Sequence, residues 1–393
     1  MSIIIQKYGG TSVGSIERMR HVAELIVGEQ NQGHKVVVIA SAMAGATNQL
    51  VKLAEQFQGA VGTDAYDFTV ATGENVSCGL LALALAEKGI NAMPLAGWQI
   101  PIRTNNIHSN ARITQIDVSA LLHLLNQGII PVITGFQGLS SDQRITTLGR
   151  GGSDTSAVAI AAALKAQRCD IYTDIDGLYT ADPRLVSDAR FIATVAYPTA
   201  LQMAALGTKI IHPRAVAIGM ESKIPIRILS SFGSDKFTTL SSKAAASGIV
   251  GISHMPNCAL VNIPVAGVHD AEAFLSTLRE SDISIDRVHE SDNVLSLCAD
   301  HTDALMIKHR LPCAELNEGY AKVSVVGGIN SSDVKTAQAI LREDGHLVHY
   351  IMSDHSRLSV VVTQADVQSV VNRLHTTFFG PPLKKIDFKA EIQ

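Results

Sequence analysis

The chain of 393 residues is longer than one hydrophobic core usually supports, so we expect two or more domains. Hydrophobic residues make up 46% and charged residues 17%, a balance typical of α/β proteins with buried parallel strands, which excludes a largely disordered chain. The net charge of -4 excludes the strongly basic surface that would gather nucleic acid or an anionic membrane.

Cysteine usage and the first residues indicate where the protein works. The cysteines are odd in number, scattered and without a C-x-x-C pair, so we expect reduced thiols and neither a disulfide framework nor a metal site. The N-terminus MSIIIQKYGG lacks a basic stretch followed by an apolar one, and no apolar run approaches the roughly 20 residues that span a bilayer. We therefore expect a soluble, cytoplasmic protein.

Up to about residue 230, short β-branched runs alternate with longer helical patterns, as a mostly parallel sheet with helices on both faces requires. The predicted strands are 3–6, 35–40, 129–134, 171–173 and 225–229. The predicted helices are 17–30, 76–88, 116–126 and 153–164, the last opened by a polar cap. We predict an α/β domain over 1–230 and, because Ser, Lys and Thr dominate there, a linker over 231–247.

The C-terminal third contains an internal repeat. The run VLSLCADHTDALMIKHRL from Val294 aligns with RLSVVVTQADVQSVVNRL from Arg357, and each reads as a strand followed by a helix. A strand, helix and strand precede each run, so two ferredoxin-like βαββαβ modules result. We place them at 248–315 and 316–393, and the second can also include the strand near 249–255.

Two glycine-rich segments suit phosphate binding. Lys7-Tyr8-Gly9-Gly10 follows a strand, and Thr11 and Ser12 can cap the helix that comes next, although a tight turn with a surface lysine fits equally well. The segment GRGGSDTS at 149–156 also leads into a helix. Neither segment has the Walker lysine, and 149–155 lacks the last glycine of G-x-G-x-x-G, so both a P-loop NTPase and a dehydrogenase are disfavoured.

The segment 172–184 places acids, an aromatic residue and an arginine after a short strand. A calcium loop is excluded because a proline stands where the closing glutamate of an EF-hand is required. A nucleotide-binding loop is the better interpretation. The residues that we expect to serve it are Thr173, Asp174, Tyr179, Arg184 and, further on, Lys209.

Six segments together resemble the aspartate kinase family of the amino acid kinase superfamily. They are KYGGTSVG at 7–14, SAMAGATN at 41–48, TGE at 72–74, TTLGRGGSDTSA at 146–157, YTDIDGLYTADPR at 172–184 and KIIHPRA at 209–215. The resemblance covers residues 1 to about 230 and implies an amino acid kinase-like α/β/α sandwich. The C-terminal repeats resemble the family's two ACT modules in pattern.

The resemblance also implies roles for individual residues. It makes Lys7 and Asp154 catalytic. The implied ATP-binding residues are Lys7, Tyr8, Gly9, Gly10, Thr173, Asp174, Tyr179, Arg184 and Lys209. The implied aspartate-binding residues are Ser41, Thr47, Glu74, Arg150, Gly151, Gly152 and Ser153. This division makes physical sense, because the ammonium of aspartate needs an anion such as Glu74 and its carboxylates suit the guanidinium of Arg150.

The implied reaction is attack of the aspartate β-carboxylate on the γ-phosphorus of ATP, with Mg²⁺ as cofactor, as the first step toward lysine, threonine and methionine. A carboxylate with a pKa of about 3.9 is already ionised at neutral pH, so positioning and charge neutralisation remain as the work of the site. The family resemblance also implies a homodimer or higher homo-oligomer through the ACT modules.

The regulatory part departs from the family pattern, because the expected Pro-Gly before the first helix of each module is missing. Asp270 and Ser331 or Ser332 remain available as helix caps. We hypothesise that the modules chiefly build a dimer interface and that inhibition by lysine or threonine is altered or absent. Whether an amino acid effector binds them stays open at this point.

Two other functions remain as alternatives. One is another acylphosphate-forming amino acid kinase, acting for instance on glutamate or acetylglutamate. The second is a catalytically silent sensor, which the intact set of Lys7, Glu74, Arg150 and Asp154 argues against. His212 is given no chemical role, since in IIHP it is more often a packed or capping residue.

Overall fold

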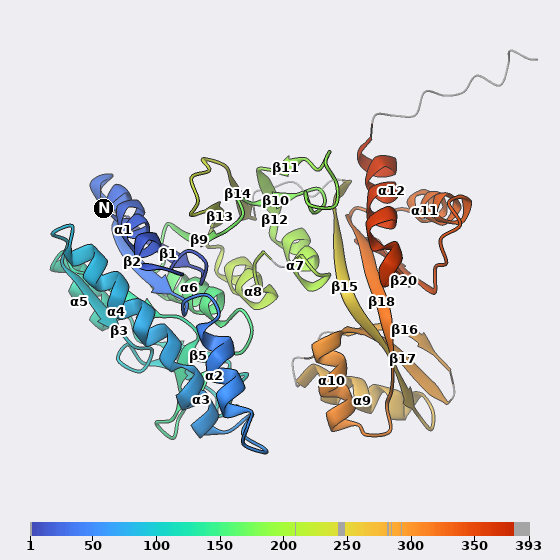
Figure 1. Cartoon of the computed structure of the whole chain (residues 1–393), viewed down its shortest axis with the longest axis horizontal. Helices are drawn as coiled ribbons and strands as arrows, with labels where there is room; N and C mark the ends of the chain where they lie inside the picture. Colours follow the sequence, from blue (N-terminus) through green and yellow to red (C-terminus); the bar gives the residue numbers. More distant parts are fainter. Residues whose placement is uncertain are drawn as a thin grey trace, which may run out of the picture. The chain divides into compact units, whose positions relative to one another are not determined.

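The computed structural model describes residues 2–208, 210–242, 248–280, 283, 285–291 and 293–380. The chain forms two compact units, which are described separately below (Figure 1). The first unit consists of Met1–Leu178, Ile192–Ala205 and Lys209–Ala245. The second consists of Tyr179–Phe191, Leu206–Thr208 and Ala246–Gln393, so the chain passes into the second unit and back before its C-terminal third begins.

An eight-stranded sheet forms the centre of the first unit. Its strands in spatial order are β12 (Thr194–Ala196), β14 (Phe237–Ser241), β13 (Ile226–Ser230), β9 (Arg168–Thr173), β1 (Ile3–Tyr8), β2 (Lys35–Ala40), β6 (Ile130–Thr134) and β3 (Ala92–Leu95). Neighbours run parallel from β13 through β3, and β14 is antiparallel to β13. The mostly parallel α/β sheet expected from the sequence is confirmed.

Helices cover both faces of this sheet (Figure 1). They are α1 (Ile16–Asn31), α4 (Thr72–Ala86), α5 (Ser119–Asn126), α6 (Gly152–Ala163), α7 (Tyr197–Ala205) and α8 (Pro213–Ser222). Helices α2 (Ala46–Ala54) and α3 (Asp64–Val70) instead pack on each other and on α4. Met19 of α1 and Leu81 of α4 share one apolar core with Ile4 and Tyr8 of β1. Successive side chains of a strand point to opposite faces, so Lys7 lies on the other face, beside α6.

Strand β14 lies within the predicted linker 231–247, so the prediction of a linker there is wrong in part. Within it, β14 adds an antiparallel strand beside β13, with Thr238 and Leu240 fully buried. A strand with one buried and one exposed face alternates apolar and polar residues, so the Ser- and Thr-rich composition of β14 resembled that of a linker. Residues 243–247 of the predicted linker lie outside the described residues.

A small second sheet brings distant segments together next to the main one. Its strands are β5 (Ile113–Ile116), β4 (Ile102–Thr104), β7 (Gln137–Leu139) and β8 (Ile145–Thr147). The predicted helix 116–126 therefore begins only at Ser119. The short strands β10 (Leu178–Tyr179) and β11 (Phe191–Ile192) pair with each other.

By length and composition, Asp64–Ala86 is apolar enough to cross a membrane. Over half of its most apolar window is buried inside the fold, and it is divided into α3 and α4 at Ala71. We therefore assign it to the core of the first unit.

The second unit contains a six-stranded antiparallel sheet. Its strands in spatial order are β16 (Ile285–Glu290), β17 (Val294–Asp300), β15 (Ile249–Pro264), β18 (Glu315–Gly327), β20 (Arg357–Thr363) and β19 (Tyr350–Asp354). The long strands β15 and β18 each run through both halves of the sheet. The first half of β15 lies beside the half of β18 that pairs with β20, so strand order on each side of the centre is that of a ferredoxin-like module.

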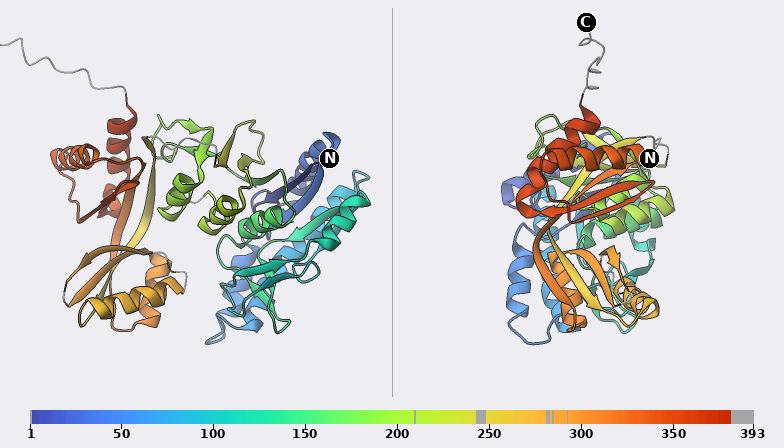
Figure 2. Two further views of the ribbon diagram at one scale, coloured as in Figure 1. Left: turned by 180° about the vertical axis from the view of Figure 1, so that it is seen from behind. Right: turned by 90° about the vertical axis from the view of Figure 1, so that its right-hand side faces the viewer.

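Two pairs of helices complete the halves of this unit. Helices α9 (Val268–Glu280) and α10 (His301–Arg310) lie at one end of the sheet, and α11 (Ser331–Glu343) and α12 (Val367–Phe379), preceded by the short helix η1 (Gln364–Asp366), lie at the other (Figure 2). Asn330, and neither Ser331 nor Ser332, caps α11, in a reciprocal capping box with Asp333. Asn330 is the cap because it directly precedes the first helical residue, Ser331.

Candidate active site

Lys7 and Asp154 form a close ion pair at the centre of the first unit. Lys7 Nζ lies 2.6 Å from Asp154 Oδ1, and both side chains are nearly buried, with exposed fractions of 11% and 12%. Lys7 stands near the carboxyl end of β1, and Asp154 stands in the first turn of α6. The parallel sheet thus brings together a cation and an acid that are far apart in the sequence, at the strand ends where α/β proteins bind ligands.

The Gly-Gly turn after β1 is held close to its neighbouring strands. Gly9 N donates to Tyr172 O at 3.1 Å, and Gly10 O accepts from Ala44 N at 3.1 Å. A Cβ on Gly10 would lie 2.8 Å from Ala42 O, so this approach requires glycine. Ser15, rather than Thr11 or Ser12, caps the helix that follows.

The side chain of Tyr8 has a structural role. It is fully buried and stacks on Tyr172, with ring centroids 4.7 Å apart. This side chain therefore belongs to the core. The alternation of β1 separates it from Lys7, which faces Asp154.

Glu74 is a buried carboxylate at the start of α4. Its exposed fraction is 3%, and Oε1 accepts from Ala42 N at 3.2 Å, while Oε2 has no hydrogen-bond partner among the described residues. Burial raises the pKa of Glu74 to about 7, and the hydrogen bond from Ala42 opposes this only in part. An under-solvated carboxylate of this kind is suited to receive a cationic group.

Ser41 and Thr47 lie near Glu74. Ser41 follows β2, its backbone N donates to Tyr8 O at 3.0 Å, and its carbonyl accepts from Ser77 Oγ of α4 at 2.6 Å. Thr47, in the first turn of α2, has its hydroxyl 3.9 Å from where a Cβ on Gly73 would stand. The segments SAMAGATN and TGE are therefore adjacent in the fold.

The segment that carries Arg150 forms a sharp turn into α6. Gly151 has φ of 64°, in the left-handed region, and a Cβ there would meet the His212 side chain at 2.2 Å. No side chain caps α6, so the predicted polar cap is wrong. Gly152 N donates to Gly149 O at 3.1 Å, and the N–H groups that follow, beginning at Ser153, are suited to an anion. Arg150 is exposed. His212 accepts from Arg214 N at 3.3 Å as the cap of α8, which fits its expected structural role.

The predicted nucleotide loop divides between the two units. Thr173 ends β9 and Asp174 follows it in the first unit, where Thr173 Oγ1 donates to Asp174 at 3.0 Å. Tyr179 and Arg184 belong to the second unit, where Arg184 Nη2 lies 2.7 Å from Asp182. Lys209 lies outside the described residues.

Side chains that could bind a metal ion are sparse among the described residues. Across the described part of the chain, no three His, Cys, Asp or Glu side chains gather as a cluster that could hold a metal alone. Asp154 points at Lys7, the cation nearest to the Gly-Gly turn. Phosphate oxygens and water would thus supply most ligands of a magnesium ion, which is the usual way in which proteins bind Mg²⁺.

Two further acids in this unit, Asp67 and Asp170, are fully buried and lie outside the predicted site residues. Asp170 accepts from Arg227 Nε at 2.6 Å and from Arg168 Nε at 3.0 Å, so it belongs to an ion-pair network within the sheet. Asp67 lies in α3 and accepts hydrogen bonds from segments about 40 and 80 positions later. No local pattern marks either acid, because their partners are distant in the sequence.

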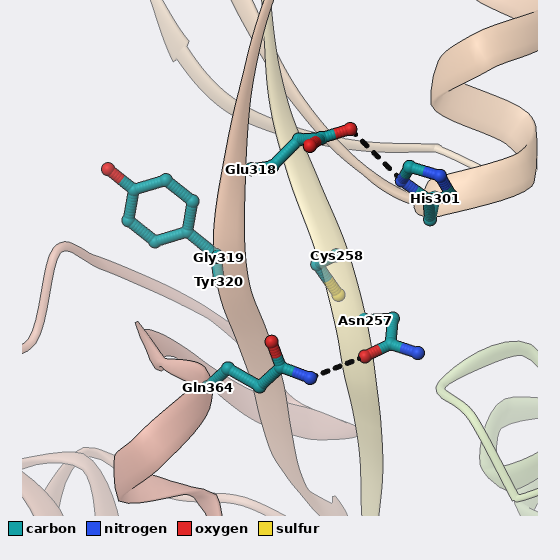
Figure 3. Close-up of a pocket in the computed structure, with 7 residues that line it drawn as sticks. All are labelled: Asn257, Cys258, His301, Glu318, Gly319, Tyr320 and Gln364. Carbon is teal, nitrogen blue, oxygen red and sulfur yellow. Dashed lines mark hydrogen bonds and ion pairs between the residues drawn. The ribbon is translucent and has the colours of Figure 1, made fainter.

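A polar hollow of about 280 Å³ lies in the second unit (Figure 3). It is lined by Asn257, Cys258, His301, Glu318, Gly319, Tyr320 and Gln364. Figure 3 shows two pairs across it, His301 with Glu318 at 3.3 Å and Gln364 with Asn257 at 2.6 Å. Because these polar groups already satisfy one another, we assign the hollow no ligand.

Comparison with known proteins gives a consistent result. A model of the amino acid kinase family matches residues 2–230. Aspartokinase 2 of Bacillus subtilis is 37% identical, covering 96% of this chain and 98% of the relative, and an aspartokinase of Geobacillus stearothermophilus is 36% identical, covering 96% and 97%. The crystal structure of aspartokinase III from E. coli with aspartate and ADP has a TM-score of 0.80 at 26% identity, covering 96% of this chain and all of that one.

Proposed function

The chain belongs to the aspartokinases of the amino acid kinase family, and we infer that it transfers the γ-phosphate of ATP to the β-carboxylate of L-aspartate. The products are 4-phospho-L-aspartate and ADP. The observation that carries the proposal is the nearly buried Lys7–Asp154 pair beside the Gly-Gly turn, in a unit that also buries Glu74.

We propose that Glu74 and Arg150 recognise the two ends of the substrate. The carboxylate of Glu74 suits the ammonium, and the guanidinium of Arg150 suits a carboxylate through paired hydrogen bonds. Ser41, Thr47 and the turn Gly151-Gly152-Ser153 would complete this pocket. Its chemistry favours a short amino acid with a second acidic group.

Catalysis in this proposal needs no general base, because the attacking carboxylate is already ionised. Lys7 stabilises charge on the transferring phosphoryl group, and Asp154 orients Lys7 through their ion pair. Gly9 N and Gly152 N are hydrogen-bonded within the protein, so the N–H groups of Gly10 and Ser153 are the ones that we propose for phosphate and carboxylate oxygens. Magnesium, bound with ATP, would supply further neutralisation of phosphate charge.

For the nucleotide we propose Thr173 at the end of β9 and Asp174 after it, together with the loop residues Tyr179 and Arg184 and with Lys209. The family match and the motif YTDIDGLYTADPR support this assignment. Tyr179 offers a ring for stacking, and the two cations suit phosphates.

A coupled assay of aspartate-dependent ADP release tests the function. The wild type should release ADP with aspartate, and less with glutamate or acetylglutamate. Lys7→Ala should lower kcat by at least about 100-fold, the usual size for loss of one group that stabilises transition-state charge. Asp154→Asn should also lower kcat, whereas a helix-capping role alone predicts little loss. Wild-type turnover in Lys7→Ala would contradict the proposed role of Lys7.

For the C-terminal unit we propose an ACT pair that assembles a homodimer or larger homo-oligomer and is the place for an amino acid effector. E. coli aspartokinase III has been crystallised with lysine and aspartate, at 27% identity and a TM-score of 0.73 to this chain. The missing Pro-Gly turns support altered or absent inhibition by lysine or threonine, which the same assay measures with each amino acid and with both.

We further propose a cytoplasmic enzyme of amino acid biosynthesis. All five cysteines are free thiols and four of them are buried, which suits a reducing compartment. An acyl phosphate hydrolyses readily in water, so a following enzyme must consume the product soon after it forms. The first step toward lysine, threonine and methionine fits this chemistry.

A further inference from the structure

Among the described residues, Asp67 is the buried carboxylate with the most hydrogen bonds that the mechanism above leaves unused. Its exposed fraction is 0%. Thr147 donates from its backbone N at 2.9 Å and from Oγ1 at 2.7 Å, Ser109 donates from its backbone N at 3.0 Å to both oxygens, and His108 Nδ1 lies 2.9 Å away. A buried charge with this many donors fixes the relative position of the segments that supply them.

One of these segments leads directly into the turn that carries Arg150. Thr147 ends β8, and its carbonyl accepts from Ala111 N at 2.9 Å. The next residue, Leu148, donates to Phe136 O at 2.9 Å and accepts from Arg214 Nη1 at 2.9 Å. The start of the glycine-rich turn is therefore anchored twice, by Arg214 at Leu148 and by Asp67 at Thr147.

Asp67 is also linked to the helix that carries Glu74. Its carbonyl accepts from Ala71 N at 3.0 Å, and Ala71 is the junction between α3 and α4. Ala71 O in turn accepts from Gln137 Nε2 at 2.6 Å. Glu74 follows in the first turn of α4.

A capping role does not account for Asp67. Thr63 already caps α3, accepting from Tyr66 N at 3.2 Å. The carboxylate of Asp67 points away from its own helix and binds residues of β8 and of the segment before β5.

We propose that Asp67 is a positioning residue that sets the separation between Glu74 and Arg150, and thereby the selectivity for aspartate over its longer homologue glutamate. This inference rests on the proposed function of that pocket. A pocket that grips both ends of a substrate discriminates by length only if its two ends are held rigidly, and a misplacement of about 1 Å can cost about 100-fold in rate.

The experiment compares Asp67→Asn with the wild type in the ADP-release assay. The new amide cannot accept from the Thr147 and Ser109 donors at both of its atoms. We expect kcat/KM for aspartate to fall by about 100-fold, chiefly through KM, with KM for ATP changed less than about twofold. The ratio of kcat/KM for aspartate to that for glutamate should also fall. Asp64→Asn, on the same helix with its side chain 51% exposed, is the matched control and should match the wild type.

Three outcomes separate the explanations. If Asp67→Asn keeps a cooperative melt and wild-type aspartate KM and selectivity, the inference is wrong and Asp67 is only structural. If Asp67→Asn does not fold, Thr147→Val, which deletes the 2.7 Å hydroxyl donor alone, must still lower selectivity, and unchanged selectivity there overturns the inference. If the wild type shows no aspartate-dependent turnover, the proposed function fails and takes this inference with it.

Discussion

At the scale of single residues, the adjacent side chains of Lys7 and Tyr8 have different roles, one in the candidate site and one in the core. Lys7 pairs with Asp154, whereas Tyr8 stacks on Tyr172 in the core. Successive side chains of a strand point to opposite faces of the sheet, which explains the difference. A sequence motif that contains both residues does not show which of the two side chains faces a ligand. The Gly-Gly loop pointed to the lysine and the family resemblance implied the acid, but only the sheet shows that their charges meet.

The buried Glu74 predicts a pH dependence of substrate binding. Its pKa of about 7 means that the unliganded site is largely protonated at pH 6 and ionised at pH 8. Only the ionised form attracts an ammonium, so KM for aspartate should fall as pH rises through 7. In Glu74→Gln the KM should be high and nearly independent of pH. Initial rates between pH 6 and 8 measure this, and parallel profiles for both proteins would exclude Glu74 as the ammonium partner.

The same carboxyl makes a prediction about stability. Because the folded pKa is raised above the unfolded value of about 4.3, the protonated form stabilises the fold at low pH, and this contribution is lost as pH rises through about 7. The loss is on the order of 3 kcal/mol. Glu74→Gln should therefore melt higher than the wild type at pH 8 and at about the same temperature at pH 4. Equal melting temperatures at both values would show that Glu74 is not destabilising when charged.

At the scale of elements, the Gly-Gly turn couples local sequence to a tertiary contact. Strand, turn and helix follow from residues 3–30, but the need for glycine at position 10 comes from the carbonyl of Ala42, which would lie 2.8 Å from a Cβ. The capping residues were harder to predict than the helices themselves. Several polar residues lie near each helix start, and Ser15 and Asn330 are the caps because their backbone is extended just before the first helical residue.

Gly10→Ala tests the turn. The added methyl would press on backbone atoms that cannot move alone, so we expect kcat to fall at least about tenfold with a lower melting temperature. Gly28→Ala, in α1 with nothing within 4 Å of the new Cβ, is the control. It should keep full activity and raise stability by about 0.5–1 kcal/mol. Equal effects of the two substitutions would show that close approach at Gly10 is unimportant.

At the scale of the whole molecule, the segment 179–191 is built into the second unit. Ala181 and Val186 are buried in the core that includes α11 and α12. Thr180 Oγ1 lies 2.9 Å from His375 Nε2, and Asn372 Nδ2 donates to Leu185 O at 2.8 Å. The predicted nucleotide loop therefore depends on residues of the C-terminal third for its structure.

Removal of everything after residue 242 should expose this loop. Limited trypsin digestion should cleave the shortened chain after Arg184 or Arg190 faster than the full chain, because Ala181 and Val186 lose their apolar partners. Cleavage after Arg144, exposed in the first unit, serves as the internal control and should be unchanged. Equal cleavage within 179–191 in both chains would show that the loop holds its structure without the second unit.

The sequence by itself determined the fold class, the family and most of the chemistry at the candidate site. Strand alternation, glycine turns and helix periodicity are local, and six short segments retain the order typical of the family. The tertiary structure decided what depends on distant partners. It brought Asp67 into hydrogen-bonding contact with Thr147, just before the turn that carries Arg150, and it added β14 to the sheet. It also extended β15 through both halves of the second unit and showed that residues 179–191 belong to that unit. Burial and long-range pairing are properties of the folded chain, so no window of sequence contains them.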